Sequence, residues 1–405
     1  MREQHDTVVI GGGQAGLAMS SVLQERGREH VVLERRRVGG RWRAERWESL
    51  RFRFPNWSLE LPEYAYSGDD PDGFAHWREI LGVIEQYAAS TRAPVREHTM
   101  VTELRAEDGG FLLSVPDGTI HARHVVVATG PFQRPRIPQL SARVPRSVFQ
   151  TDPTRYRRPE DLPDGAVLVV GSGASGCQIG EELLRAGRTV FLSVSRHRRV
   201  PRRFRGKDVY WWLDRMGRFA QTIDSLPDRQ WPPSTVVTGV TGGYDVNVRQ
   251  MAADGIRVLG RVLDASDGAL AIARNANEVL EEVDKAFAGF LVAAREFAET
   301  NPDLELTEDD PTGSPVPPVP VAEVESLNLQ RENVATIVWA TGYDYDWLQV
   351  PVLDLQGRPI QHRGIGPLLP GAALDAHIQI RPIRGRRERR RIPRRAPRPH
   401  ITGED

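Results

Sequence analysis

Short runs of branched apolar residues recur along the chain and mark its predicted strands. These runs do not alternate with polar residues, which is typical of parallel strands buried on both faces. Amphipathic helical patterns follow two of the runs directly, at residues 14–26 and 174–186, and a longer one covers residues 276–300. Because strands alternating with helices form βαβ units, the pattern predicts an α/β fold. The runs are TVVIGGG (7–13), VVLERR (31–36), HVVVATG (124–130), AVLVVGSG (166–173), TVFLSVSR (189–196) and VATIVWATG (334–342).

A glycine-rich turn follows the first predicted strand. Gly11, Gly13 and Gly16 lie between this strand and the first helix, and Glu34 closes the next strand 18 residues after Gly16. In such a Gly-x-Gly-x-x-Gly turn, one glycine permits the tight turn, one lets backbone N–H groups approach a pyrophosphate, and one allows close helix–strand packing. The acid accepts hydrogen bonds from a ribose diol. The alternative is a glycine-rich turn without a ligand, but the flanking elements and the acid favour a dinucleotide site.

A second glycine turn, GSGASG at residues 171–176, repeats the order of strand, turn and helix. The strand after it carries no acid and ends in Ser195 and Arg196, with Arg198 and Arg199 just beyond. A carboxylate would repel the 2′-phosphate of NADP(H), whereas an Arg guanidinium offers a charge-assisted fork for it. We therefore expect this turn to prefer NADP(H), unless these arginines form only a solvated surface. The residues assigned to this second site are Gly171, Gly173, Ser175, Gly176 and Arg196.

Two turns with different ribose chemistry imply two different dinucleotides. FAD at the first and NADPH at the second is the economical pair, because a flavin accepts hydride from nicotinamide and then reacts in one-electron or oxygen chemistry. We predict two dinucleotide-binding Rossmann-like domains, the second inserted in the first, with Pro- and Gly-rich crossings at 131–138, 153–165 and 311–320. The expected parts are an FAD-binding domain at 1–150, an NADPH-binding domain with a helical elaboration at 160–322, a return to the FAD-binding domain at 323–366 and an atypical tail at 367–405.

Composition narrows the chemistry further. The chain of 405 residues is 40% hydrophobic, enough to bury a sizeable core. Its one cysteine, Cys177, excludes an intramolecular disulfide, a redox CxxC pair, disulfide reductase chemistry and a cysteine-rich zinc site, and we predict no metal site. No apolar run approaches the ~18–20 residues of a membrane span, and no secretory signal is recognisable. We therefore expect a soluble, cytoplasmic protein with no membrane partner.

Further motifs, in chain order, resemble a known family. Gly39-Gly40-Arg41-Trp42 follows the acidic strand, and Ala128-Thr129-Gly130 and Ala340-Thr341-Gly342 end two later strands. Over roughly residues 5–365 the chain resembles the flavin-containing monooxygenases, in particular bacterial flavoproteins similar to indole-3-pyruvate monooxygenases. The resemblance implies that Asn56 acts near the reactive face of the flavin. The cofactor-binding residues that it implies are Gly40, Arg41, Trp42, Val101, Ala128, Thr129, Gly130, Ala340, Thr341 and Gly342.

The resemblance also implies a reaction. NADPH would reduce the flavin, and the reduced flavin would react with O2 to give a C4a-hydroperoxyflavin that delivers one oxygen atom to a small organic substrate. The protein would position the reactants and exclude water, which otherwise releases hydrogen peroxide. The sequence identifies neither the substrate nor the oligomeric state.

Two departures from the family pattern leave alternatives open. Asp152 and Pro153 stand where the family pattern places His and Ser, which makes an NADPH-dependent flavin reductase or oxidase without organic oxygenation a second hypothesis. After about Gly366 the resemblance stops, and residues 381–405 hold ten Arg against three acids, a net charge of +7. This tail could be a shifted reading frame, a solvated end or, less in keeping with its lack of aromatic residues, a nucleic-acid-binding segment. If the flavin site lacks a wall there, the chain would be an inactive nucleotide-binding protein.

Overall fold

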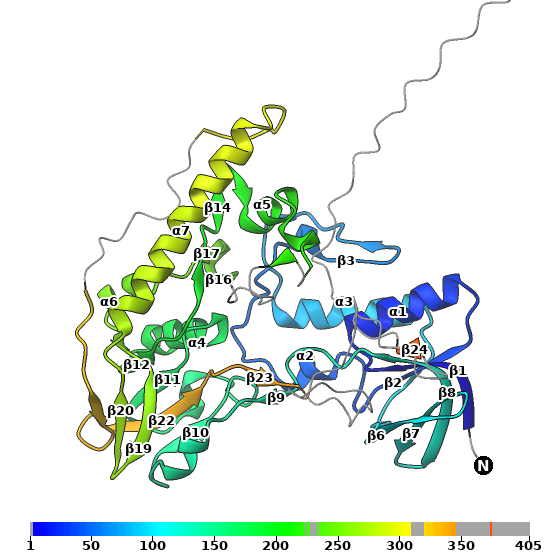
Figure 1. The fold of residues 1–405 in the computed structure, drawn as a ribbon, viewed down its shortest axis with the longest axis horizontal. Helices are drawn as coiled ribbons and strands as arrows, with labels where there is room; N and C mark the ends of the chain where they lie inside the picture. Colours follow the sequence, from blue (N-terminus) through cyan, green and yellow to red (C-terminus); the bar gives the residue numbers. More distant parts are fainter. Residues whose placement is uncertain are drawn as a thin grey trace, which may run out of the picture.

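The computed structural model describes residues 3–222, 225–226, 233, 235–308, 320–345 and 373–374. Within them the chain forms two lobes, each built around a sheet with parallel strands (Figure 1). The predicted α/β fold is therefore confirmed. Both glycine turns follow the first strand of a βαβ unit.

The first sheet has the strand order β5-β2-β1-β8-β7-β6. Its first four strands are parallel, and β6 and β7 extend it as an antiparallel meander. A short strand, β24 (Ala373–Leu374), also pairs with β8 in parallel, so the chain returns to this sheet after the point where the motif resemblance stops. The other strands are β1 (Glu3–Ile10), β2 (His30–Leu33), β5 (Val95–Arg96), β6 (Glu103–Glu107), β7 (Gly110–Val115) and β8 (Gly118–Val127).

Two helices cover one face of the first sheet. They are α1 (Gln14–Glu25) and α3 (Trp77–Ser90), and they lie next to one another in Figure 1. Leu17 of α1 and Ile80, Ile84 and Tyr87 of α3 belong to one buried cluster. Because burying each such apolar side chain contributes roughly 1.5–3 kcal/mol, this cluster holds the two helices against one another next to the first glycine turn at the start of α1.

The second sheet has five parallel strands in the order β10-β22-β11-β12-β18. Burial of every residue in β11 and β12 explains their unbroken, mostly apolar sequence. The strands are β10 (Phe149–Thr151), β11 (Ala166–Val170), β12 (Val190–Ser193), β18 (Arg257–Leu259) and β22 (Val334–Trp339), and the helices beside them are α4 (Ala174–Arg185) and α6 (Val248–Ala253).

The sheet boundaries differ from the expected domain boundaries. β22 pairs between β10 and β11 in the second sheet, although residues 323–366 were expected to return to the first domain. The chain therefore passes from the first sheet toward the second after Val127, where β8 ends. It leaves the second sheet after Trp339, where β22 ends. These two segments are the crossings between the lobes. A strand buried on both faces has the same sequence pattern in either sheet, so the pattern alone could not assign β22.

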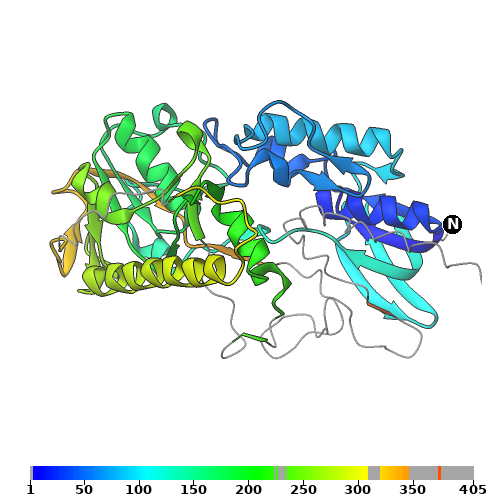
Figure 2. The same cartoon turned by 90° about the horizontal axis from the view of Figure 1, so that it is seen from above.

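The two crossings pair with one another between the lobes. β9 (Arg134–Pro135) and β23 (Tyr343–Asp344) form a two-stranded antiparallel ribbon. This ribbon lies between the two sheets in Figure 1, and Figure 2 shows the lobes side by side from above. The ribbon thus links the end of one ATG segment to the end of the other.

The second lobe carries the predicted long helix. α7 (Ala276–Glu299) buries a stripe that includes Leu280, Val283, Phe290 and Ala294, at the spacing of one helix face. Its far half packs with α5 (Val209–Arg215), where Trp212 contacts Phe297 edge to face. None of the described helices combines the length and apolar character needed to cross a bilayer.

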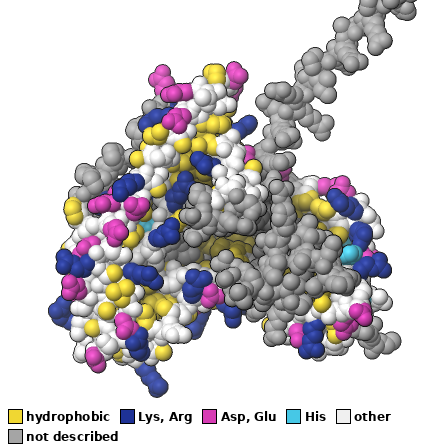
Figure 3. All heavy atoms as spheres, in the orientation of Figure 1, with side chains coloured by type: hydrophobic (Ala, Val, Ile, Leu, Met, Phe, Trp, Pro, Cys, Tyr) yellow, Lys and Arg dark blue, Asp and Glu magenta, His cyan; other side chains and the backbone are white. Residues whose placement is uncertain are grey.

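Smaller elements complete the described fold. Five of the short strands lie near the site: β13 (Arg198–Arg199), β16 (Thr235–Thr238), β17 (Tyr244–Asp245) and the hairpin strands β3 (Glu60–Leu61) and β4 (Tyr64–Ala65). The remaining strands are β14 (Arg203–Phe204), β15 (Lys207–Asp208), β19 (Val262–Ser266), β20 (Ala269–Ile272) and β21 (Ser326–Asn328). On the face shown in Figure 3, basic and acidic side chains of the second lobe are interspersed. The Arg-rich tail lies outside the described residues.

Candidate functional site

The first glycine turn depends on contacts that only glycine permits. Gly11 has φ = 115°, and a Cβ there would lie 2.5 Å from the carbonyl oxygen of Ala128. A Cβ on Gly16 would lie 1.9 Å from the carbonyl oxygen of Gly11. The chain therefore folds tightly here, with the Ala128-Thr129-Gly130 segment directly behind the turn.

The second turn repeats this geometry closely. Gly171 has φ = 112°, and a Cβ there would lie 2.4 Å from the carbonyl oxygen of Ala340. A Cβ on Gly176 would again lie 1.9 Å from an oxygen, that of Gly171. Each ATG segment thus backs one glycine turn, which explains why the two motifs occur twice and in the same order.

Both turns also present an uncapped helix end. Gly13 is the N-cap of α1 and Gly173 that of α4, and neither helix start is capped by a side chain. A Cβ on either glycine would meet no atom within 4 Å. Free N–H groups in open space at a helix N-terminus attract an anion, so both turns fit the diphosphate of a dinucleotide.

Glu34 lies beside the first turn, as its spacing predicts. One carboxylate oxygen accepts from the backbone N–H of Gly12 at 2.7 Å, and the other accepts from that of Arg36 at 2.9 Å. The side chain is largely buried, so these bonds fix its orientation. Each oxygen keeps a further lone pair, which fits the acceptance of ribose hydroxyl protons.

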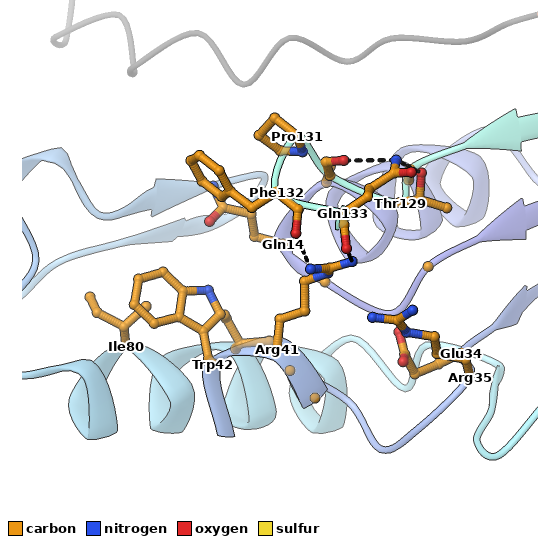
Figure 4. A pocket seen from close by; sticks show the side chains of 18 of the residues that line it. Gln14, Glu34, Arg35, Arg41, Trp42, Ile80, Thr129, Pro131, Phe132 and Gln133 are labelled. Carbon is orange, nitrogen blue, oxygen red and sulfur yellow. Dashed lines mark hydrogen bonds between the residues drawn. The ribbon is translucent and has the colours of Figure 1, made fainter. Parts of the chain in front are cut away.

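A cavity of about 500 Å³ opens from the first turn. It runs to an apolar end that includes Phe52, Phe54 and Tyr64. Figure 4 shows Trp42 and Arg41 along it, between Ile80 and the Glu34–Arg35 end. Its size and its mixture of apolar walls and few polar groups are typical of a cofactor site. The predicted residues that line it are Gly11, Gly13, Glu34, Gly40, Arg41, Trp42, Val101, Ala128, Thr129 and Gly130.

Arg41 joins the cavity wall to the first crossing. Its guanidinium donates to the carbonyl oxygens of Phe132 and Gln133 (Figure 4). It also pairs with Glu45 at 2.8 Å. Burial lowers the pKa of Arg41, but the group stays charged at any physiological pH. Gln133 also donates to the hydroxyl of Thr129 at 2.6 Å. These bonds fix the segment that connects the cavity to the ribbon between the lobes.

We expect Arg41→Met to destabilise the first lobe. The change leaves the carbonyl groups of Phe132 and Gln133 without this donor and removes one of the arginines that pair with the Glu45 carboxylate, which keeps Arg36. Hydrogen bonds to charged groups contribute about 1.5–3 kcal/mol. Arg41→Lys cannot donate to three acceptors in the same plane, but it keeps the positive charge beside Glu45. It should therefore lose less stability than Arg41→Met. Urea unfolding followed by tryptophan fluorescence measures both; equal midpoints for the wild type and Arg41→Met would contradict this role.

Asn56 lies beside the cavity and not in its wall. It starts the short 3-10 helix η1 (Asn56–Ser58), is buried, and donates from Nδ2 to the carbonyl oxygen of Asp70 at 2.9 Å. Its Oδ1 has no hydrogen-bond partner. Ser58 and Leu59, which follow it, do line the cavity. A buried acceptor without a partner is costly and calls for a functional explanation.

Arg46 and the aromatic end of the cavity were not predicted. The Arg46 guanidinium lies over the Trp42 ring, 4.6 Å from its centroid, and burial lowers its pKa. Phe52 contacts Trp42 edge to face, and Phe54 lies 4.3 Å from the Tyr210 ring of α5, centroid to centroid. The spacing of Trp42 and Arg46, four residues apart, was the only sequence signal for this cluster.

The arginines at the second site differ in their availability. Arg199 is buried and pairs with Asp245 at 2.8 Å, so it is not free to bind a phosphate. Arg198 is half-buried, and burial lowers its pKa. Arg196 is exposed and makes no ion pair within the described part of the chain. Of the three, Arg196 best fits the predicted phosphate contact.

The remaining predicted residues lie around the second turn and the crossings. Ser175 is in the first turn of α4, and the hydroxyl of Thr341 donates to the carbonyl oxygen of Arg136 across the ribbon. Gly342 has φ = 91° and accepts from the N–H of Arg136 at 2.9 Å. Asp152, by contrast, is buried in a turn and accepts from Thr154. Among the described residues, no cluster of His, Cys, Asp and Glu could hold a metal ion.

The family model for pyridine nucleotide-disulphide oxidoreductases matches residues 8–216, which contain both glycine turns. The chain belongs to this family. It is therefore an oxidoreductase, but the disulphide chemistry in the family's name does not extend to it: Cys177 is its one cysteine, is fully buried, and has its pKa raised by that burial.

Relatives in this family support the predicted resemblance. An uncharacterized CzcO-like oxidoreductase of Geobacillus kaustophilus is 30% identical over 367 residues, covering 89% of this chain and 87% of the relative. An indole-3-pyruvate monooxygenase of Oryza sativa subsp. japonica is 29% identical over 184 residues, covering 44% and 45%. The similarity to flavin-containing monooxygenases is thus confirmed.

The fold is shared with a solved flavin-containing monooxygenase from Stenotrophomonas maltophilia. The two structures match with a TM-score of 0.59 over 92% of this chain and 89% of the other, at 17% sequence identity. At this identity the match shows the fold alone. It agrees with two Rossmann-type units in one chain.

Proposed function

We propose that the chain is an FAD- and NADPH-dependent monooxygenase that acts on a small organic molecule with O2. The proposal rests on the duplicated glycine turn, one copy beside Glu34 and the other beside Arg196, with a ribbon joining the segments behind them. FAD, when bound, supplies hydride acceptance and the activation of O2. The names of the relatives, among them indole-3-pyruvate monooxygenase, favour oxygen transfer.

The residues of the first lobe have defined tasks in this proposal. The N–H groups at the start of α1 hold the diphosphate, and Glu34 accepts from the ribose hydroxyls. The apolar end of the cavity, with Phe52 and Phe54, excludes water from the reacting groups. Asn56 Oδ1 is a buried acceptor beside the cavity without a hydrogen-bond partner, and it is suited to accept a hydrogen bond from a group bound there.

A second candidate is an NADPH oxidase that releases hydrogen peroxide. It is favoured by Asp152, which replaces the expected His and whose carboxylate oxygen Oδ1 is occupied by Thr154 at 2.8 and 2.6 Å. The organic oxygenation step would then lack one of the groups that the family pattern supplies. The two candidates differ in the amount of peroxide formed per NADPH consumed.

We expect Asn56→Ala to raise the peroxide formed per NADPH toward one. Loss of the Oδ1 acceptor should slow oxygen transfer to the substrate about tenfold relative to peroxide release, which is the size of one hydrogen bond to a reacting group. The rate of NADPH oxidation should change little. Asn301→Ala is the matched control, since it removes a similar amide-to-carbonyl bond at the end of α7. A wild type that already releases one peroxide per NADPH with every substrate tested would favour the oxidase.

A further inference from the structure

Ser172 occupies the middle of the second glycine turn, where the first turn has Gly12. Its side chain is fully buried. The hydroxyl accepts from the backbone N–H of Ser195 at 2.9 Å and donates to the carbonyl oxygen of Ser195 at 3.0 Å. The side chain of Ser172 therefore fastens the chain just after β12 to the glycine turn. The first turn makes its corresponding bond differently, through the Glu34 carboxylate.

His197 completes this connection from the other side of Arg196. Its Nδ1 lies 2.9 Å from both the Ser172 hydroxyl and the Ser195 carbonyl oxygen, and the ring is buried. Nε2 is buried without a partner. With the proton on Nδ1, the ring can donate to the Ser195 carbonyl oxygen, and Nε2 is a buried acceptor without a partner. With the proton on Nε2, that atom would be a buried donor without a partner. The Nδ1–H tautomer is therefore favoured. Burial also lowers the pKa of His197, which keeps the ring neutral.

Arg196 is thus held between two fixed neighbours. Ser195 is bonded at both its N–H and its carbonyl group, and His197 is bonded through its ring. The Arg196 side chain itself is exposed and unpaired among the described residues, while Arg199 is committed to Asp245. The network fixes the backbone on both sides of Arg196 and leaves its guanidinium free.

We propose that Ser172 and His197 are positioning residues that hold Ser195 and Arg196 ready for the 2′-phosphate of NADP(H). The inference rests on the proposed use of NADPH at this turn and explains how the preference is set. A site fixed before binding loses less conformational freedom when the ligand arrives, so its affinity rises. Ser172 and His197 therefore act on the phosphate-bearing ligand alone, through Arg196, and do not contact the reacting nicotinamide.

The test measures the binding of two fragments to the full chain by calorimetry: 2′,5′-ADP, which carries the 2′-phosphate, and 5′-AMP, which lacks it. We expect Ser172→Ala and His197→Leu each to weaken 2′,5′-ADP about 3- to 10-fold and to leave 5′-AMP unchanged. His197→Asn, which keeps a donor near the Nδ1 position, should restore most of the preference. In turnover, KM for NADPH should rise in the first two variants while kcat stays constant.

Arg196→Gln separates this inference from the proposed function. If the wild type does not prefer 2′,5′-ADP, the assignment of NADPH to this turn fails. If the wild type prefers it, Arg196→Gln abolishes the preference, and Ser172→Ala and His197→Leu keep it, the positioning role is overturned and the NADPH assignment stands. An equal loss of both fragments in Ser172→Ala and His197→Leu indicates a merely structural role and also overturns the inference.

Discussion

Gly16→Ala is expected to destabilise the first lobe more than any other single methyl addition at the first turn. The added Cβ would lie 1.9 Å from the carbonyl oxygen of Gly11, and neither backbone can move because Gly11 is itself pressed against Ala128. Overpacking a filled site costs about 1–3 kcal/mol, and a contact between two backbone segments belongs at the upper end of this range. Urea unfolding with a fluorescence readout measures the loss.

Gly13→Ala is the matched control for this prediction. Gly13 has φ = −91°, which any residue adopts, and its Cβ would point into open space. Measured on FAD-free chains, its free energy of unfolding should therefore equal that of the wild type or exceed it slightly, since alanine restricts the unfolded chain. Equal unfolding midpoints for Gly13→Ala and Gly16→Ala would contradict the packing described for the turn.

The second large effect separates the two cofactor sites. Gly13→Ala should weaken FAD binding, because the methyl group occupies the space in which the diphosphate approaches the α1 N-terminus. Gly173→Ala should weaken NADPH binding for the same reason at α4 and leave FAD bound. A clash of about 1–3 kcal/mol corresponds to roughly 5- to 150-fold in Kd. Flavin absorbance after gel filtration measures the first, and calorimetry with NADP+ measures the second.

The two variants control for one another. Each keeps its own fold, since both added methyl groups point into open space, and each should spare the other ligand. If Gly13→Ala lost NADP+ as well, or if Gly173→Ala lost FAD, the two turns would not serve separate dinucleotides. Retention of both cofactors by both variants would equally contradict the account.

The sequence predicted those features that depend on local geometry. Each glycine turn lies between a strand and a helix, as its spacing requires. The helix predicted at 276–300 is α7, which ends one residue earlier, at Glu299. Glu34 was identified because it stands at the end of the strand that follows the glycine turn, at the spacing from the turn that a ribose-binding acid requires. Such features involve neighbours in the sequence, so their patterns contain the information needed.

Features that depend on tertiary packing could not be predicted. β22 has the same apolar sequence in either sheet, and only its pairing with β10 and β11 places it. Arg199 looked as suitable for a phosphate as Arg196 until Asp245, 46 residues away, was found to bind it. The apolar end of the cavity likewise brings Phe54 next to Tyr210, from separate lobes.

The most direct test of the account is an anaerobic titration of the FAD-loaded chain with NADPH. The account predicts that the yellow flavin band bleaches with one equivalent of NADPH, and more weakly with NADH, because it assigns a flavin to the first turn and a phosphorylated nicotinamide dinucleotide to the second. A chain that takes up no FAD, or one whose bound flavin stays oxidised in excess NADPH while dithionite still bleaches it, would contradict the central claim.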